Sequence, residues 1–169
     1  MINILYGESD FKTLIVEDWF YQDRTIFIEK LEKWSSKYPV FLRPRRFGKS
    51  LFVSLLQYYY GLDYKDEFQT LFGNLYIGHQ PTKLANSYMI LRLEFSGIDT
   101  VTHESTYRGF LINVIVGVQS FLRSYGVFFT EFTEQDKQII LAQTSPEAVI
   151  KKLLTRCSSF WVILTPLIA

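Results

Sequence analysis

The most informative segment of the sequence is Val40-Phe41-Leu42-Arg43-Pro44-Arg45-Arg46-Phe47-Gly48-Lys49-Ser50. Its first three residues are apolar, which is typical of a short buried strand. The polar segment Arg43 to Gly48 follows, and apolar residues then recur at helical spacing from Leu51 to Tyr59, until Gly61 ends the pattern. The sequence therefore predicts a strand, a basic loop that ends in glycine, and a helix, in this order.

A phosphate-binding loop is built in the same order. Backbone N–H groups at a helix N-terminus, together with the positive end of the helix dipole, attract phosphate oxygens. Gly48 lets the backbone approach a ligand closely, Lys49 would reach the β and γ phosphates of ATP, and the Ser50 hydroxyl would bind Mg²⁺. The usual pattern has Gly where this chain has Arg43, and the alternative interpretation is a basic turn that faces water.

The rest of the chain predicts strands that alternate with helices. Two further segments of high β propensity are expected to be strands, Tyr88 to Phe95 and Phe160 to Leu164, the second cut short by Pro166. Further helices are expected at Thr25 (as the cap) to about Ser35, Glu67 to Phe72, Tyr107 to Tyr125, Glu134 to Ala142 with Thr133 as the cap, and after the pair Ser145-Pro146. Strands separated by helices indicate an α/β fold with a short parallel sheet flanked by helices.

Composition and charge narrow the class of protein. The 169 residues fit one domain with a substantial core, and 48% hydrophobic and 17% aromatic content excludes a disordered chain. Eighteen Lys and Arg against 17 Asp and Glu leave a net charge of +1, which gives no long-range attraction to nucleic acid or to anionic membranes. A single cysteine and the lack of a signal-like start or a long apolar run predict a cytoplasmic protein without membrane contact.

Arg43 to Leu51 reads Arg-Pro-Arg-Arg-Phe-Gly-Lys-Ser-Leu and resembles the signature loop of the bacterial AAA-ATPase-like proteins. Other segments are similar to motifs of that family: Phe20 to Thr25 with Ile28, Leu75 to Gly78, and Leu91 to Ile98. The family also departs from the general loop pattern at Arg43, and its members often carry a nuclease-like domain of the restriction-enzyme type. The resemblance implies an incomplete P-loop NTPase fold of the AAA type, with three layers, in a single domain over residues 1–169.

The resemblance also implies which residues bind nucleotide. These are the loop residues Arg43, Pro44, Arg45, Arg46, Phe47, Gly48, Lys49, Ser50 and Leu51, with ATP and Mg²⁺ as the cofactors and Ser50 reaching Mg²⁺ through the nucleotide. By analogy with related ATPases, the segment Tyr21 to Thr25 would touch adenine or ribose, and the alternative there is an edge strand with a helix cap at Thr25. The expected partner is a nucleotide, while neither a nucleic-acid partner nor an oligomeric state is predicted.

An ATPase of this class also needs a strand that ends in Asp, usually followed by Glu, to hold the Mg²⁺ shell and orient the attacking water. Phe160 to Leu164 resembles that strand, but Thr165-Pro166-Leu167-Ile168-Ala169 follows, and no carboxylate side chain occurs after Cys157. We therefore expect a truncated, N-terminal part of the domain that binds ATP with slow or absent hydrolysis, and assign no catalytic residue. The alternatives are a non-catalytic interaction or remnant domain of a degraded gene, and a small-molecule kinase, which the neighbouring motifs match less well.

The other candidate groups are interpreted as structural. Glu94 is expected to be solvated or paired with an arginine rather than to act in catalysis. His79 and His103 lie far apart without a cysteine at ligand spacing, which disfavours a metal site, and Cys157 has no histidine in its segment to activate it. The tyrosine run at residues 58–60 points in different directions on a helix, which favours packing over base stacking.

Overall fold

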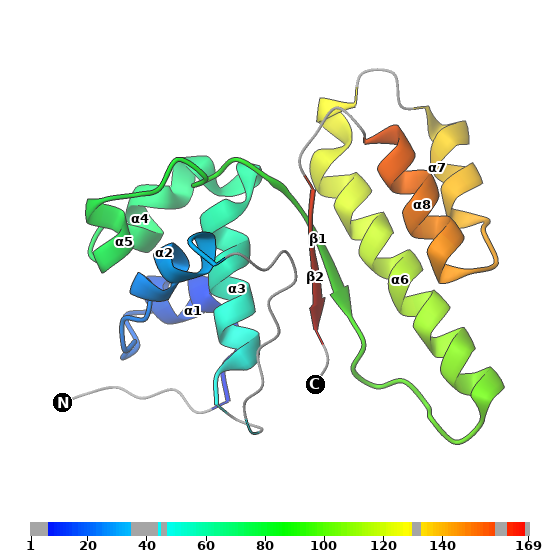
Figure 1. The fold of residues 1–169 in the computed structure, drawn as a ribbon, viewed down its shortest axis with the longest axis horizontal. Helices are drawn as coiled ribbons and strands as arrows, with labels where there is room; N and C mark the ends of the chain where they lie inside the picture. Colours follow the sequence, from blue (N-terminus) through cyan, green and yellow to red (C-terminus); the bar gives the residue numbers. More distant parts are fainter. Residues whose placement is uncertain (1–6, 35–43, 45–46, 130–132, 158–161, 168–169) are drawn as a thin grey trace. The chain divides into compact units, whose positions relative to one another are not determined.

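The computed structural model describes residues 7–34, 44, 47–129 and 133–157, and the backbone of residues 162–167. Figure 1 shows the elements within these ranges, which are α1 (Phe11–Val16), α2 (Ile26–Glu32), α3 (Lys49–Tyr60), η1 (Leu62–Glu67), α4 (Phe68–Phe72), α5 (Tyr76–His79), β1 (Met89–Glu94), α6 (His103–Tyr125), η2 (Gly126–Phe128), α7 (Glu134–Leu141), α8 (Pro146–Arg156) and β2 (Val162–Leu167). Helices and strands together confirm the α/β class. The predicted strand at residues 40–42 lies outside the described residues, and the three-layer fold stays a prediction.

The chain folds as two compact units, Met1–Ser87 and Tyr88–Ala169. The first unit is held together by aromatic rings from short helices. Phe72 of α4 stacks on Phe11 of α1 with ring centroids 5.1 Å apart, and meets Tyr59 of α3 edge-on at 5.5 Å. All three side chains are fully buried. The second half of α3 is therefore anchored in the core of this unit, and the sequence prediction that Tyr59 packs rather than binds a base agrees with its burial.

The second unit contains a parallel pair of strands with helices packed beside it (Figure 1). β1 and β2 are in register from Met89 opposite Val162 to Glu94 opposite Leu167. Pro166 lies inside β2, opposite Leu93, so the expectation that this proline ends the strand is wrong. A proline is tolerated in a strand where its missing N–H would not face the partner strand.

Helix α6 is the main support of this strand pair. The helix contacts β1 and α8, and its buried residues are Val114, Val118, Phe121, Leu122 and Tyr125. Gly117 lies so close to β1 that an added Cβ would be 2.7 Å from the carbonyl oxygen of Arg92. The glycine that weakens the helix by its propensity is therefore the residue that permits the close approach of helix and strand.

The helices of the second unit are capped by threonine and serine side chains. Thr102 and Ser105 form a capping box at the start of α6, and Thr133 and Asp136 form another at the start of α7, as predicted for Thr133. Ser145 caps α8, with Pro146 in the first turn. The short helices α1 and α5 have no counterpart among the elements predicted from the sequence.

One stretch of the described chain, His103–Phe128, is long and apolar enough to cross a membrane by length and composition, with a mean hydropathy of 1.3. Core helices of soluble proteins pass the same test. Here α6 packs on β1, α7 and α8, and 28% of its most apolar window is buried.

Candidate nucleotide-binding site

The candidate site is the start of α3, where the basic loop meets the helix. Gly48 is the N-cap residue and has a left-handed conformation, with φ of 70° and ψ of 26°. A Cβ at this position would meet no atom of the described structure within 4 Å. The backbone therefore turns into the helix through a conformation that favours glycine.

The first turn of α3 closes on this glycine, because the Phe52 N–H donates to the Gly48 carbonyl oxygen at 2.9 Å. The N–H groups before Phe52 have no partner inside an α-helix, and no side chain among the described residues caps them. Their dipoles add to a helix of 12 residues, which favours negative charge at this end. Such a helix start can bind an anion such as phosphate.

The predicted binding residues fall partly within the described ranges. Lys49, Ser50 and Leu51 are half-buried on the first turn, while Phe47 is 59% exposed and Pro44 is exposed. The arginines predicted to bind nucleotide, Arg43, Arg45 and Arg46, lie outside the described residues. The structure thus brings Gly48, Lys49 and Ser50 together at one helix end, where a lysine and a hydroxyl are suited to phosphate and Mg²⁺.

The segment before α2 differs in part from its prediction. Thr25 is the N-cap residue of α2, as predicted, although its side chain makes no cap hydrogen bond. Asp23 engages this turn instead, since one of its carboxylate oxygens accepts from the N–H and the hydroxyl of Thr25 at 2.8 and 2.7 Å. The residues at 21–24 are not in a strand, which also corrects the edge-strand alternative.

Asp23 and Thr25 also join this segment to α5. The second oxygen of Asp23 accepts from the Tyr76 N–H at 2.8 Å, and the Thr25 hydroxyl accepts from the Ile77 N–H at 3.1 Å. Partial burial pushes the pKa of Asp23 upward, but the hydrogen bonds outweigh it and lower the pKa. The side chains of Asp23 and Thr25 are hydrogen-bonded within the protein and support this turn. The contact of Tyr21 to Thr25 with adenine or ribose stays a prediction.

Two side chains of the second unit have groups that could take part in chemistry. The Glu94 side chain is exposed at the end of β1 and accepts a hydrogen bond from the Ser96 hydroxyl at 3.0 Å, a solvated position as expected. Cys157 is 2% exposed, and burial raises the pKa of its thiol to about 11. A buried, protonated thiol is a poor nucleophile, so Cys157 is a core residue.

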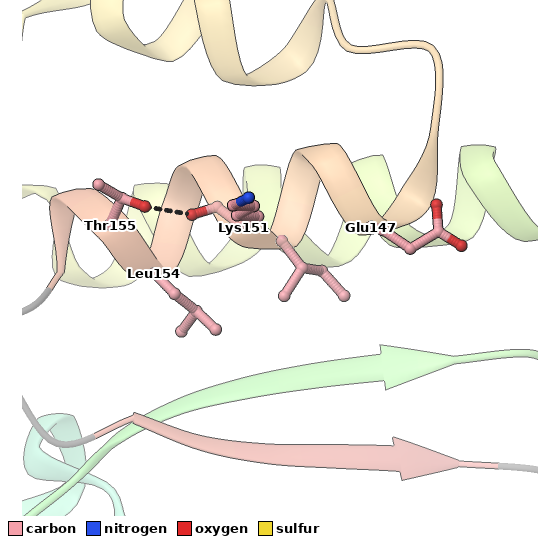
Figure 2. Close-up of a pocket in the computed structure, with 5 residues that line it drawn as sticks. Glu147, Lys151, Leu154 and Thr155 are labelled. Atoms are coloured by element: carbon pink, nitrogen blue, oxygen red, sulfur yellow. Dashed lines mark hydrogen bonds between the residues drawn. The ribbon is translucent and has the colours of Figure 1, made fainter.

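An open hollow of about 610 Å³ lies along one face of α8 (Figure 2). Its lining comes from this helix alone, with Glu147, Ile150, Lys151, Leu154 and Thr155. The Thr155 hydroxyl donates to the Lys151 carbonyl oxygen at 2.7 Å, a bond internal to the helix that Figure 2 draws as a dashed line. Convergent polar groups from different elements, which define a binding site for a small molecule, are not found in this lining.

The described residues form the helices and strands of an α/β protein. Gly48 is the N-cap residue of helix α3, and a basic segment of the sequence precedes it. The model of the family described as predicted AAA-ATPase matches residues 5–161, and the chain belongs to this family. No curated protein and no solved structure matches it.

Proposed function

We propose that this chain binds ATP with Mg²⁺ through the loop at residues 43–51. The observation that carries the proposal is the left-handed Gly48 at the start of α3, with no atom of the described residues within 4 Å of where its side chain would be. Membership of a family described as predicted AAA-ATPase supports ATP as the ligand.

The residues present fit such a ligand. The N–H groups of the first turn would hold phosphate oxygens, Lys49 would neutralise the β and γ phosphates, and the Ser50 hydroxyl would hold Mg²⁺. Bound Mg²⁺ would supply charge neutralisation between phosphate oxygens. The two compact units would then be parts of one AAA-type domain with a three-layer fold, as the family resemblance implies.

We further propose that hydrolysis is slow or absent. A carboxylate beside the Mg²⁺ and another that orients water are needed for turnover. In the second unit β2 (Val162–Leu167) carries Thr165 and Pro166 and contains no Asp or Glu. Glu94 at the end of β1 is exposed and bonded to Ser96, an arrangement that favours solvation over catalysis.

Thermal unfolding with and without Mg-ATP tests the binding proposal. At an ATP concentration about 100-fold above Kd, the free energy of unfolding should rise by about 2.7 kcal/mol. For a chain of this size each kcal/mol shifts the melting temperature by roughly 2–4 °C, so a rise of about 5–10 °C is expected. Lys49→Ala should abolish the rise and Arg46→Ala should reduce it. The exposed Lys65 of η1 provides a matched control, because Lys65→Ala removes the same charge from the same unit.

The outcomes separate the alternatives. An unchanged melting temperature at millimolar Mg-ATP would refute nucleotide binding and favour a non-catalytic interaction domain. A phosphate-release assay addresses the second half of the proposal. Sustained turnover by the purified chain that Glu94→Gln removes would show that hydrolysis occurs and that Glu94 supplies the missing acid.

A further inference from the structure

Asp10 is the centre of a hydrogen-bond cluster that joins α1 to α3. One of its carboxylate oxygens accepts from the hydroxyls of Ser54 and Tyr58 on α3, both at 3.0 Å. The other accepts from the N–H and the hydroxyl of Thr13 on α1, at 3.0 and 3.1 Å. The Ser54 hydroxyl in turn accepts from the Phe11 N–H at 3.0 Å. Each oxygen of the carboxylate thus serves a different helix.

Burial and charge make this cluster strong. Ser54 is 1% exposed and Phe11 is fully buried, so losing the Ser54 hydroxyl would leave the Phe11 N–H without its partner away from water. Partial burial pushes the pKa of Asp10 upward, but bonds from Thr13, Tyr58 and Ser54 outweigh it and lower the pKa. The carboxylate is therefore ionised at neutral pH, and hydrogen bonds to an ionised acceptor are stronger than neutral ones.

The positions of the donors on α3 connect the cluster to the candidate site. Ser50, Ser54 and Tyr58 are four residues apart, so they follow one another along the same side of the helix. Ser54 lies one turn after Ser50, which is the proposed Mg²⁺ ligand. Figure 1 shows α1 beside α3 within the first unit, and the two helices are in contact.

A helix cap alone does not account for the cluster. An N-cap aspartate needs to accept only from its own helix, as one oxygen of Asp10 does from Thr13. The second oxygen is directed at α3 and accepts twice from it. Burial and the bond to Asp10 raise the pKa of Tyr58, so its hydroxyl keeps its proton and remains a donor.

We propose that Asp10 is a positioning residue for the start of α3, because it fixes the turn of this helix directly behind Lys49 and Ser50. The proposal rests on the proposed function for its consequence, which is tighter binding of Mg-ATP. A displacement of about 1 Å at a binding group is enough to weaken an interaction with phosphate. Asp10 would touch neither nucleotide nor metal, and would act through Ser54 and Tyr58.

Three conservative variants separate positioning from stability. Ser54→Ala and Tyr58→Phe remove bonds that cross from Asp10 to α3. Thr13→Val is the matched control, since it removes one hydroxyl bond of the same carboxylate that ends within α1. Amide hydrogen exchange without nucleotide reports on the Phe52 N–H, whose bond to Gly48 closes the first turn of α3. Isothermal titration of the same proteins with Mg-ATP reports on the consequence.

Tyr58→Phe should raise the exchange rate at Phe52 about three- to tenfold and weaken Mg-ATP binding by a similar factor, as expected for one lost hydrogen bond. Ser54→Ala should have an effect at least as large, because it also removes the acceptor of the Phe11 N–H. Thr13→Val should change both by less than about twofold, even where its melting temperature falls equally. Unchanged exchange in Tyr58→Phe, or an equal effect of Thr13→Val, would overturn the proposal. Tyr58→Phe loses a single partly buried hydroxyl and keeps the test open if Ser54→Ala does not fold.

The two readouts also separate this proposal from the proposed function. Exchange at Phe52 is measured without nucleotide, so it decides whether Asp10 holds the first turn even in a chain that binds no ATP. If exchange rises in the α3 variants while the wild type shows no heat with Mg-ATP, the proposed function fails and the anchoring of α3 stands. If the wild type binds ATP and exchange is unchanged, the function stands and Asp10 has no positioning role.

Discussion

Replacing Gly117 of α6 by alanine would push the helix away from β1. An added Cβ would lie 2.7 Å from the Arg92 carbonyl oxygen and 2.7 Å from a methyl group of Leu93, against an ordinary contact of 3.4–4 Å. The Leu93 side chain can rotate, but the Arg92 backbone is fixed because it pairs with Thr165 of β2. The helix or the strand pair must therefore move.

The expected change in the free energy of unfolding follows from two opposing effects. Alanine is favoured over glycine in a helix by about 1 kcal/mol, whereas overpacking typically costs about 1–3 kcal/mol. Since the contact is with fixed backbone, a cost near the upper end is expected, and Gly117→Ala should lower the free energy of unfolding by about 1–2 kcal/mol. Gly126→Ala is the matched control, because Gly126 has a right-handed helical conformation and an added Cβ meets nothing within 4 Å. It should raise stability by about 0.5–1 kcal/mol.

Urea unfolding followed by circular dichroism measures both variants, and hydrogen exchange in α6 assigns the change to the second unit. The reasoning would be refuted if Gly117→Ala were stabilised as much as Gly126→Ala, since helix propensity alone would then explain both results.

Three further predictions concern a core leucine of α8, the charge of Asp23 and the thiol of Cys157. Leu153 is fully buried in α8 while its neighbour Leu154 is 42% exposed, so Leu153→Ala should lower the unfolding free energy by about 2–4 kcal/mol and Leu154→Ala by under about 1 kcal/mol in urea unfolding. The pKa of Asp23 is lowered from 3.8 in the folded state, so its stabilisation is present above that value and is lost as the pH falls through the folded pKa. Asp23→Asn should therefore flatten the loss of stability below about pH 4 in melts at graded pH. Cys157, with its pKa raised to about 11, should react with a thiol reagent at pH 8 only as fast as the protein opens, and reaction as fast as that of a free thiol would contradict its burial.

Periodic and capping patterns in the sequence predict the elements that are long or well capped. The helix predicted at Tyr107 to Tyr125 and the cap at Thr133 depend on residues within a few turns of each other. Both agree with the structure, in which the helix begins four residues earlier, at His103. The sequence does not predict helix α1, because its six residues are too few to show a helical period. The burial of α1 also depends on α3 and α4, which are distant in sequence.

In the candidate site, too, the sequence predicts the features that depend on neighbouring residues and not those that depend on residues distant in the chain. Gly48 before an amphipathic helix is a local pattern, and it correctly locates the start of α3. The sequence does not single out Asp10, because its bonds to Ser54 and Tyr58 bridge more than 40 residues. The residue type of Thr25 correctly indicates the N-cap position of α2. Its N–H and hydroxyl both donate to Asp23, two positions earlier, a pairing that the sequence pattern does not show.

Isothermal titration of the purified chain with Mg-ATP tests the central proposal most directly. We expect one saturable site with a Kd in the micromolar range, which corresponds to a binding free energy of about 8 kcal/mol in magnitude. Lys49→Ala should bind at least about tenfold more weakly. No saturable heat at millimolar Mg-ATP, or equal affinity of wild type and Lys49→Ala with both proteins folded, would contradict nucleotide binding at the start of α3.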